Sequence, residues 1–122
     1  MCNINGFFKQ LGVKVDVHAT PYSYCDGEYN LNIGGQKSWE PRSVCCLKGG
    51  GQVVLSQACI LIDADVEKIV EPVRLCNHLC GHDDDIRGDV HTPLFHHISD
   101  RPSVDSLFQQ LTSAFLTHAK AE

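Results

Sequence analysis

The hydrophobic period of this chain changes after Asp63, and that change limits the folds that the sequence can adopt. Before Asp63, apolar and polar residues alternate over residues 13–17 and 29–33, which is the pattern of half-buried strands. Residues 43–47 form a shorter candidate strand, and residues 52–62 form a β-branched run without charged residues. Because strands buried on both faces have this composition, residues 52–62 are predicted to be the central strand of a sheet.

Beyond that point, apolar residues recur with the period of an α-helix. One stripe covers residues 66–80, and Gly81 is placed to end this helix. A second stripe covers residues 103–119, where Ser103 is suited to cap the first turn. Strands first and helices last predict an α+β fold, a small and mostly antiparallel sheet with two C-terminal helices packed on one face. The whole chain, residues 1–122, is expected to form a single compact domain.

Charge and length exclude several classes of protein. Ten Lys and Arg against fifteen Asp and Glu give a formal net charge of −5 at pH 7. The basic residues are scattered and offer no cluster for the phosphates of a nucleic acid. No apolar run approaches the ~18 residues of a membrane span. Residues 1–11 lack the pattern of a secretory signal, so we expect an intracellular protein, cytoplasmic or nuclear, with reduced thiols.

Cysteine and histidine gather between residues 76 and 97, which hold five of the seven histidines and two of the seven cysteines. Thiolate and imidazole are the usual ligands of structural zinc, and Cys76 and Cys80 are spaced to share one helix face. His82 follows the predicted helix end, and a fourth ligand is available from His91, His96 or His97. The sequence therefore predicts one structural zinc ion held by Cys76, Cys80, His82 and, as the preferred fourth ligand, His96.

A second interpretation of the same stretch needs no metal. Buried cysteine behaves as a small hydrophobic residue, and histidines in a polar loop are usually solvated. The long loop predicted over residues 82–101 would then be ordered by apolar packing of Leu94, Phe95 and Ile98 onto the helices. If zinc orders the loop instead, the loop should loosen below about pH 6, because imidazole ligands must be neutral.

A cysteine with a nearby histidine suggests an alternative function, nucleophilic catalysis. Cys25 lies in a predicted loop, and His18 is close to it in the sequence. Cys2 would become the N-terminal residue if the initiator methionine is removed. No flanking signature marks any of these residues as activated. The alternative they suggest is a cysteine-dependent hydrolase or transferase.

The function expected from the whole sequence is a small, non-enzymatic binding or regulatory module that acts through protein contacts. Four phenylalanines supply more apolar surface than so small a domain is expected to bury: Phe7, Phe8, Phe108 and Phe115. A homodimer through the C-terminal helix or an exposed strand would cover this surface. Trp39 is expected in a polar loop, where its side chain would cover a sheet edge or, alternatively, act as an anchor for a partner. A further alternative is a viral or bacterial effector that docks on a host protein.

Overall fold

The fold is a four-stranded antiparallel sheet with three α-helices. The computed structural model describes residues 4–24 and 27–121, apart from the side chains of residues 42–48, 52–54, 56 and 118–121. The elements follow one another as α1 (Ile4–Gln10), β1 (Asp16–Val17), β2 (Leu31–Ile33), β3 (Gln36–Lys48), β4 (Gly51–Ile60), α2 (Val66–Leu79), the single turns η1 (Gly88–Val90) and η2 (Leu94–His96), and α3 (Val104–Ala121). The α+β class predicted from the sequence is confirmed.

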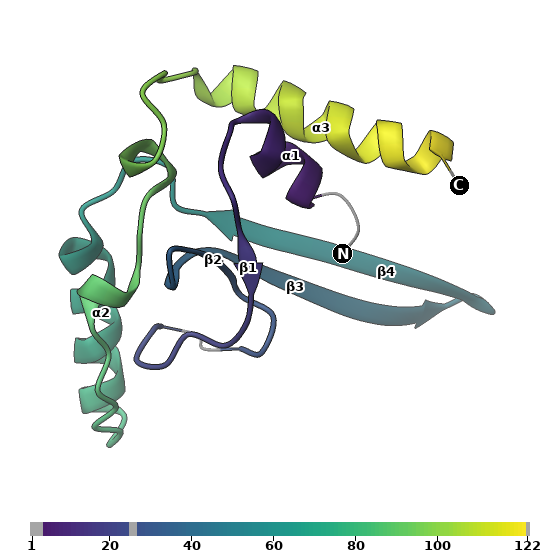
Figure 1. The fold of residues 1–122 in the computed structure, drawn as a ribbon. Coiled ribbons are helices and arrows are strands. Elements are labelled where there is room, and N and C mark those ends of the chain that lie inside the picture. Colours follow the sequence, from purple (N-terminus) through teal and green to yellow (C-terminus); the bar gives the residue numbers. More distant parts are fainter. Residues whose placement is uncertain (1–3, 25–26, 122) are drawn as a thin grey trace.

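The sheet is a meander with the strand order β1-β2-β3-β4. Its largest part is the β3–β4 hairpin, which is closed by Gly49 and Gly50 with φ of 60° and 79°. Glycine adopts these positive φ values without strain, and a two-residue turn of this kind matches the twist of the two strands. Pairing runs from Lys48↔Gly51 to Trp39↔Ile60, whereas β2 pairs only with the first residues of β3. The far part of the hairpin therefore extends beyond β1 and β2 (Figure 1).

The prediction that residues 52–62 form the central strand is wrong in one respect. The segment is a strand, but β4 lies at the edge of the sheet and pairs only with β3 within the described chain. An uncharged β-branched sequence suits an edge strand as well as a buried one, so composition alone could not separate the two positions. The short strand predicted at residues 43–47 belongs to β3, which already begins at Gln36.

The core lies between the sheet and the pair of helices α1 and α3. Phe7 and Phe8 of α1 are almost completely buried and meet edge to face, with ring centroids 5.2 Å apart. Phe8 also contacts the indole of Trp39 edge to face at 5.9 Å. Leu107 and Ala114 of α3 complete the core on the helix side. Trp39 is thus a core residue on β3, and the expectation that it lies in a polar loop is wrong.

The segment between α2 and α3 is held by backbone hydrogen bonds to the sheet and to the chain that leaves it. The Leu94 N–H donates to the Leu61 carbonyl at 2.7 Å, and the Phe95 N–H donates to the Ile62 carbonyl at 2.9 Å. The Thr92 N–H donates to the Lys37 carbonyl at 2.8 Å, and the side chain of Leu94 is fully buried. Backbone pairing and apolar burial therefore order this segment.

The ends of the two long helices follow local sequence signals. At the end of α2, the Gly81 N–H donates to the His78 carbonyl and the His82 N–H to the Asn77 carbonyl, which is a Schellman motif. At the start of α3, the Ser106 N–H donates to Ser103 Oγ at 3.1 Å. Figure 1 shows α3 beside α1 and nearest to β4, while α2 lies at the end of the molecule away from the hairpin tip.

Candidate functional site

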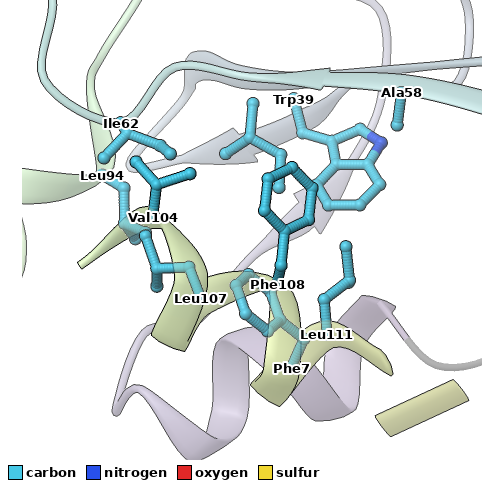
Figure 2. A pocket seen from close by; sticks show the side chains of 10 residues that line it. Phe7, Trp39, Ala58, Ile62, Leu94, Val104, Leu107, Phe108 and Leu111 are labelled. Carbon is cyan, nitrogen blue, oxygen red and sulfur yellow. The ribbon is translucent and has the colours of Figure 1, made fainter. Parts of the chain in front are cut away.

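An apolar groove lies between α3 and β4 and encloses a cavity of about 140 Å³. Its strand side is formed by Ala58 and Ile60 of β4 together with Trp39, and its helix side by Val104, Phe108 and Leu111. Figure 2 shows these side chains converging from the strands above and the helices below. The cavity is close in size to one that holds a benzene molecule in an engineered protein core. The groove can therefore accept about one large apolar side chain.

The exposed half of α3 explains why the groove is open. Leu107 and Ala114 face the core, and Leu111 packs against it half-buried, whereas an outward stripe of Val104, Phe108 and Phe115, at the helical spacing i, i+4 and i+11, is exposed. Phe108 is 63% exposed and Phe115 is 49% exposed, although both are large apolar residues. Phe7 and Phe8, in contrast, are buried. Of the four phenylalanines expected to supply surplus apolar surface, only the two on α3 are exposed.

Trp39 is the one residue described along the groove whose side chain contains a polar atom. The indole is buried, and its Nε1–H has no hydrogen-bond partner among the described residues. A buried donor without an acceptor costs about 1–3 kcal/mol. A residue that borders the groove therefore carries a buried donor whose hydrogen bond the described chain does not complete.

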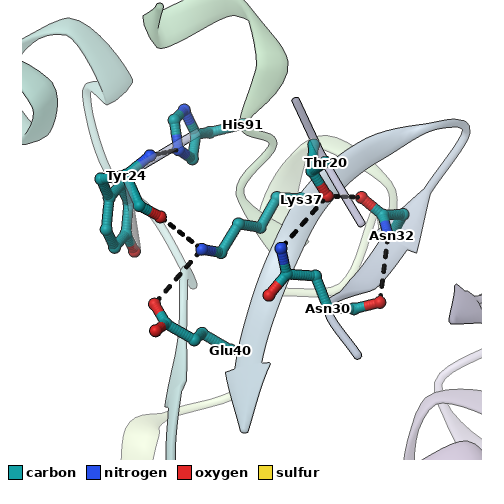
Figure 3. Close-up of polar contacts among 7 residues, drawn as sticks. All are labelled: Thr20, Tyr24, Asn30, Asn32, Lys37, Glu40 and His91. Carbon is teal, nitrogen blue, oxygen red and sulfur yellow. Dashed lines mark hydrogen bonds and ion pairs between the residues drawn. The ribbon is translucent and has the colours of Figure 1, made fainter. Parts of the chain in front are cut away.

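A second unusual region surrounds Lys37 on β3, whose side chain is only 1% exposed (Figure 3). Its Nζ donates to the Tyr24 carbonyl at 2.6 Å and forms an ion pair with Glu40 Oε2 at 3.2 Å. The ammonium also lies 4.5 Å from the centre of the Tyr24 ring. A buried charge is stable only when it is paired and hydrogen-bonded, and Lys37 meets both conditions.

His91 closes this cluster from the segment that follows η1. Its ring stacks on Tyr24 with centroids 4.8 Å apart, and the Tyr24 N–H donates to His91 Nε2 at 3.3 Å. Nδ1 donates to the Gly88 carbonyl at 3.3 Å, so these contacts fit the neutral ring with its proton on Nδ1. Burial lowers the pKa of His91 below its ordinary value, and the charge of Lys37 adds to that effect. The cluster ties residues 20–24 and the segment after η1 to β3.

Next to this cluster, a neutral network joins the same loop to β2. Thr20 Oγ1 donates to Asn32 Oδ1 at 2.5 Å, and Asn32 Nδ2 donates to the Asn30 carbonyl at 3.0 Å. All three residues are buried. Their hydrogen bonds satisfy the polar side chains that the loop brings into the interior.

The four residues predicted to bind zinc lie at the surface. Cys76 and Cys80 are exposed along and just after α2, His82 follows them, and His96 lies in η2. Within the described residues, no three His, Cys, Asp or Glu side chains come close enough together to hold a metal ion. The other two candidate histidines have protein contacts: His91 as above, and His97 through its Nε2, 2.7 Å from Thr92 Oγ1. The zinc prediction thus receives no support from this arrangement.

In the interpretation without a metal, the part that placed both cysteines on a buried stripe is wrong. Val70 is the buried residue of α2, whereas Cys76 and Cys80 point to solvent together with Leu75 and Leu79. The physical reason is the position of α2 at the margin of the molecule, where it packs mainly against η1. Only its first half reaches the interior.

The candidate nucleophiles Cys2 and Cys25 lie outside the described residues, so their relation to His18 is not placed. His18 itself is exposed, and its Nδ1 lies 2.7 Å from the Ala19 carbonyl. Comparison of the sequence with models of known protein families and with curated proteins finds no match. None of the helices in the described part of the chain has the length and apolar character that crossing a bilayer requires.

Sequence reasoning missed the cluster around Lys37 and located the groove only in part. The apolar face of α3 was visible from its spacing, but the distance between that face and β4 is a tertiary property. Nothing in the residues flanking Lys37 distinguishes it from an ordinary strand lysine. Its partners Tyr24 and His91 are far apart in the sequence, so no local signal could have found the cluster.

Proposed function

We propose that this chain is a small, non-enzymatic binding module that acts through protein contacts at the groove between α3 and β4. The observation that carries the proposal is the position of Phe108, which is 63% exposed beside an apolar cavity. Small monomers rarely leave a contiguous apolar surface of this kind open unless it meets another molecule. The groove and the outward stripe of α3 form one such surface.

The energetics favour a partner that presents apolar side chains. Burying a phenylalanine side chain contributes roughly 1.5–3 kcal/mol, so Phe108 and Phe115 together can supply the centre of an interface. The stripe of α3 beside the groove carries no charged residue. An apolar partner that covers it therefore removes no charged group from water. An anionic or strongly polar ligand would find only the buried Trp39 Nε1 as a donor.

The ionisable side chains of the interior support a non-enzymatic function. Lys37 pairs with Glu40, and His91 forms a hydrogen bond with a backbone carbonyl. None of the three side chains lines the groove. The proposal gives them a structural role. The proposal also requires no zinc ion. Metal analysis of the protein tests the predicted ligand set of Cys76, Cys80, His82 and His96 independently of the groove. The cysteine-dependent enzyme remains an alternative that depends on Cys25.

Site-specific photo-cross-linking tests the proposed surface. A benzophenone amino acid replaces Phe108, and in a matched variant it replaces Gln109, the adjacent exposed residue of the same helix. Both proteins are irradiated in cells that make the chain naturally, and protein adducts are identified by mass spectrometry. We expect discrete adducts from position 108 that are absent from position 109. Equal labelling at both positions, or none at position 108, would show that the groove is not a protein-binding site.

The same adducts separate the possible partners. An adduct of twice 13.5 kDa that contains only this chain identifies a homodimer. An adduct with a different protein identifies a heterologous partner, and a host protein in this position would favour the effector alternative. Each of these outcomes supports a binding module.

A further inference from the structure

Within the described residues, no strand lies beside the row of backbone groups at the outer edge of β4. In a hairpin closed by two residues, the closing pair Lys48↔Gly51 exchanges hydrogen bonds, and every second pair after it does the same. The Leu61 N–H donates to the Ser38 carbonyl at 2.9 Å, which continues this alternation. The backbone N–H and C=O groups of the residues in between therefore point away from β3: Gln52, Val54, Ser56, Ala58 and Ile60.

The other edges of the sheet are protected, and this edge is not. β1, at the opposite side, has only two residues, one of which is Asp16. The outer edge of β3 continues beyond β2 but contains Pro41 and the charged residues Glu40, Arg42 and Lys48. Short length, proline and charge are the usual features that stop strand addition. β4 has ten residues and none of these features.

We propose that the partner of the groove is a second copy of this chain, joined by antiparallel pairing of β4 with β4 across a two-fold axis. This inference rests on the proposed function, because it names the partner of the same surface. An antiparallel strand pair is self-complementary, so one edge can meet its own copy in a closed dimer. An axis at Ser56 places Gln52 opposite Ile60 of the partner subunit and allows about ten hydrogen bonds.

Charge does not oppose a second copy at this edge. Each chain has a net charge of −5, so two copies repel unless their contact is neutral and lies away from the acidic residues. β4 has no charged residue, and the outward stripe of α3 has none either. The acidic run Asp83–Asp84–Asp85 follows α2, at the end of the molecule away from the hairpin tip (Figure 1).

The groove adds apolar contact to the backbone pairing. β4 is the strand nearest to α3, so a strand added at its outer edge widens the floor beneath Phe108 and Leu111. A ten-residue strand is about 34 Å long, so the pairing and the apolar side chains beside it run along the whole length of β4. The pairing also consumes the one unprotected edge, so assembly stops at two copies.

Charge exchange at the axis tests the proposal. Analytical ultracentrifugation of the full chain should show a particle of twice 13.5 kDa at micromolar concentration. Ser56→Glu and Ser56→Lys each place like charges opposite each other at the axis, and each variant should raise the dimer Kd at least about 100-fold. Mixing the two variants should restore a dimer, because opposite charges then meet. Ser56→Ala is the matched control and should keep the wild-type Kd.

A second variant tests the backbone pairing itself. Ala58→Pro removes an outward N–H that β3 does not use, so the hairpin should persist in circular dichroism while the dimer Kd rises at least about tenfold. A wild-type chain that stays monomeric up to millimolar concentration would overturn the inference. So would a dimer that keeps its Kd in Ser56→Glu. The proposed function fails separately, if position 108 gives no protein adduct.

Discussion

The region around Lys37 and the groove beside Phe108 differ in what they bury and what they leave exposed. Around Lys37, the chain buries a charge, an imidazole and a carboxylate, and it supplies partners for them from β3 itself and from two distant segments. Around Phe108, the chain leaves a large apolar side chain outside although an apolar cavity lies beside it. The polar region is complete in the single chain, and the apolar region is not.

The difference follows from what each kind of group costs when it lacks a partner. An unpaired buried charge costs several kcal/mol, so the fold cannot form around Lys37 unless every contact is made. An exposed phenylalanine only withholds a gain of roughly 1.5–3 kcal/mol, which a partner can supply later. Incomplete surfaces in this protein are therefore expected to be apolar, and they are expected to be places of assembly.

The largest loss of stability is expected from a substitution in the cluster around Lys37. Lys37→Met keeps the aliphatic length but removes the ammonium that holds Glu40 and the Tyr24 carbonyl. We expect the free energy of unfolding to fall by about 3 kcal/mol in urea titrations. Lys9→Met, on the exposed face of α1, is the control and should change it by less than about 0.5 kcal/mol. Equal losses in the two variants would mean that the cluster is not stabilising.

Two neighbouring residues on α3 test whether the apolar groove is open in the single chain. Leu107 is 5% exposed and faces the core, whereas Phe108 is exposed at the groove. Leu107→Ala should lower the free energy of unfolding by about 2–4 kcal/mol. Phe108→Ala should lower it by less than about 1 kcal/mol in dilute solution, where a dimer does not contribute. If Phe108→Ala lowers the free energy of unfolding more than Leu107→Ala does, Phe108 is part of the core and the groove is closed in solution.

Acidification is expected to loosen the polar side before the apolar side. The folded-state pKa of His91 is lower than that of the unfolded chain, so the unfolded state binds protons first. The stability that neutral His91 contributes is complete above about pH 6.5 and is lost as the pH falls below that value. Hydrogen exchange should show the amides of Tyr24 and Thr92 losing protection first. His91→Gln should reduce the pH dependence.

The smallest effect is expected at the margin of the molecule, where Cys80 is exposed. Cys80→Ser should change the free energy of unfolding by less than about 0.5 kcal/mol, because the exposed thiol makes no packing contribution. Thermal unfolding with and without a chelator, together with metal analysis, provides the measurement. One equivalent of zinc that is lost in Cys80→Ser, with a lower melting temperature, would establish the predicted site of Cys76, Cys80, His82 and His96.

The helices and the fold class were predictable because their signals are local. The apolar stripe and Ser103 set the start of α3 within one residue, and Gly81 set the end of α2. The hairpin was predictable in kind, since two β-rich runs flank a glycine turn. Each of these signals acts within a few residues of the position it determines.

The positions of elements relative to one another were not predictable in the same way. Whether residues 52–62 lie in the centre or at the edge depends on whether another strand pairs with the outer side of β4, and the strand order of the described chain places none there. The pattern on α2 placed Cys76 in a core that the helix does not reach, because its second half passes beyond the sheet. The Lys37 cluster and the groove both combine segments from distant parts of the sequence, so no window of residues contains either of them.

Trp39 gives the protein a built-in optical reporter. It is the only tryptophan of the chain, its indole is buried against Phe8, and one side of it borders the groove. Its emission should therefore be blue-shifted in the folded chain, and an occupant of the groove should change its intensity and reduce its quenching by acrylamide. Filling of the groove can thus be followed without any added dye.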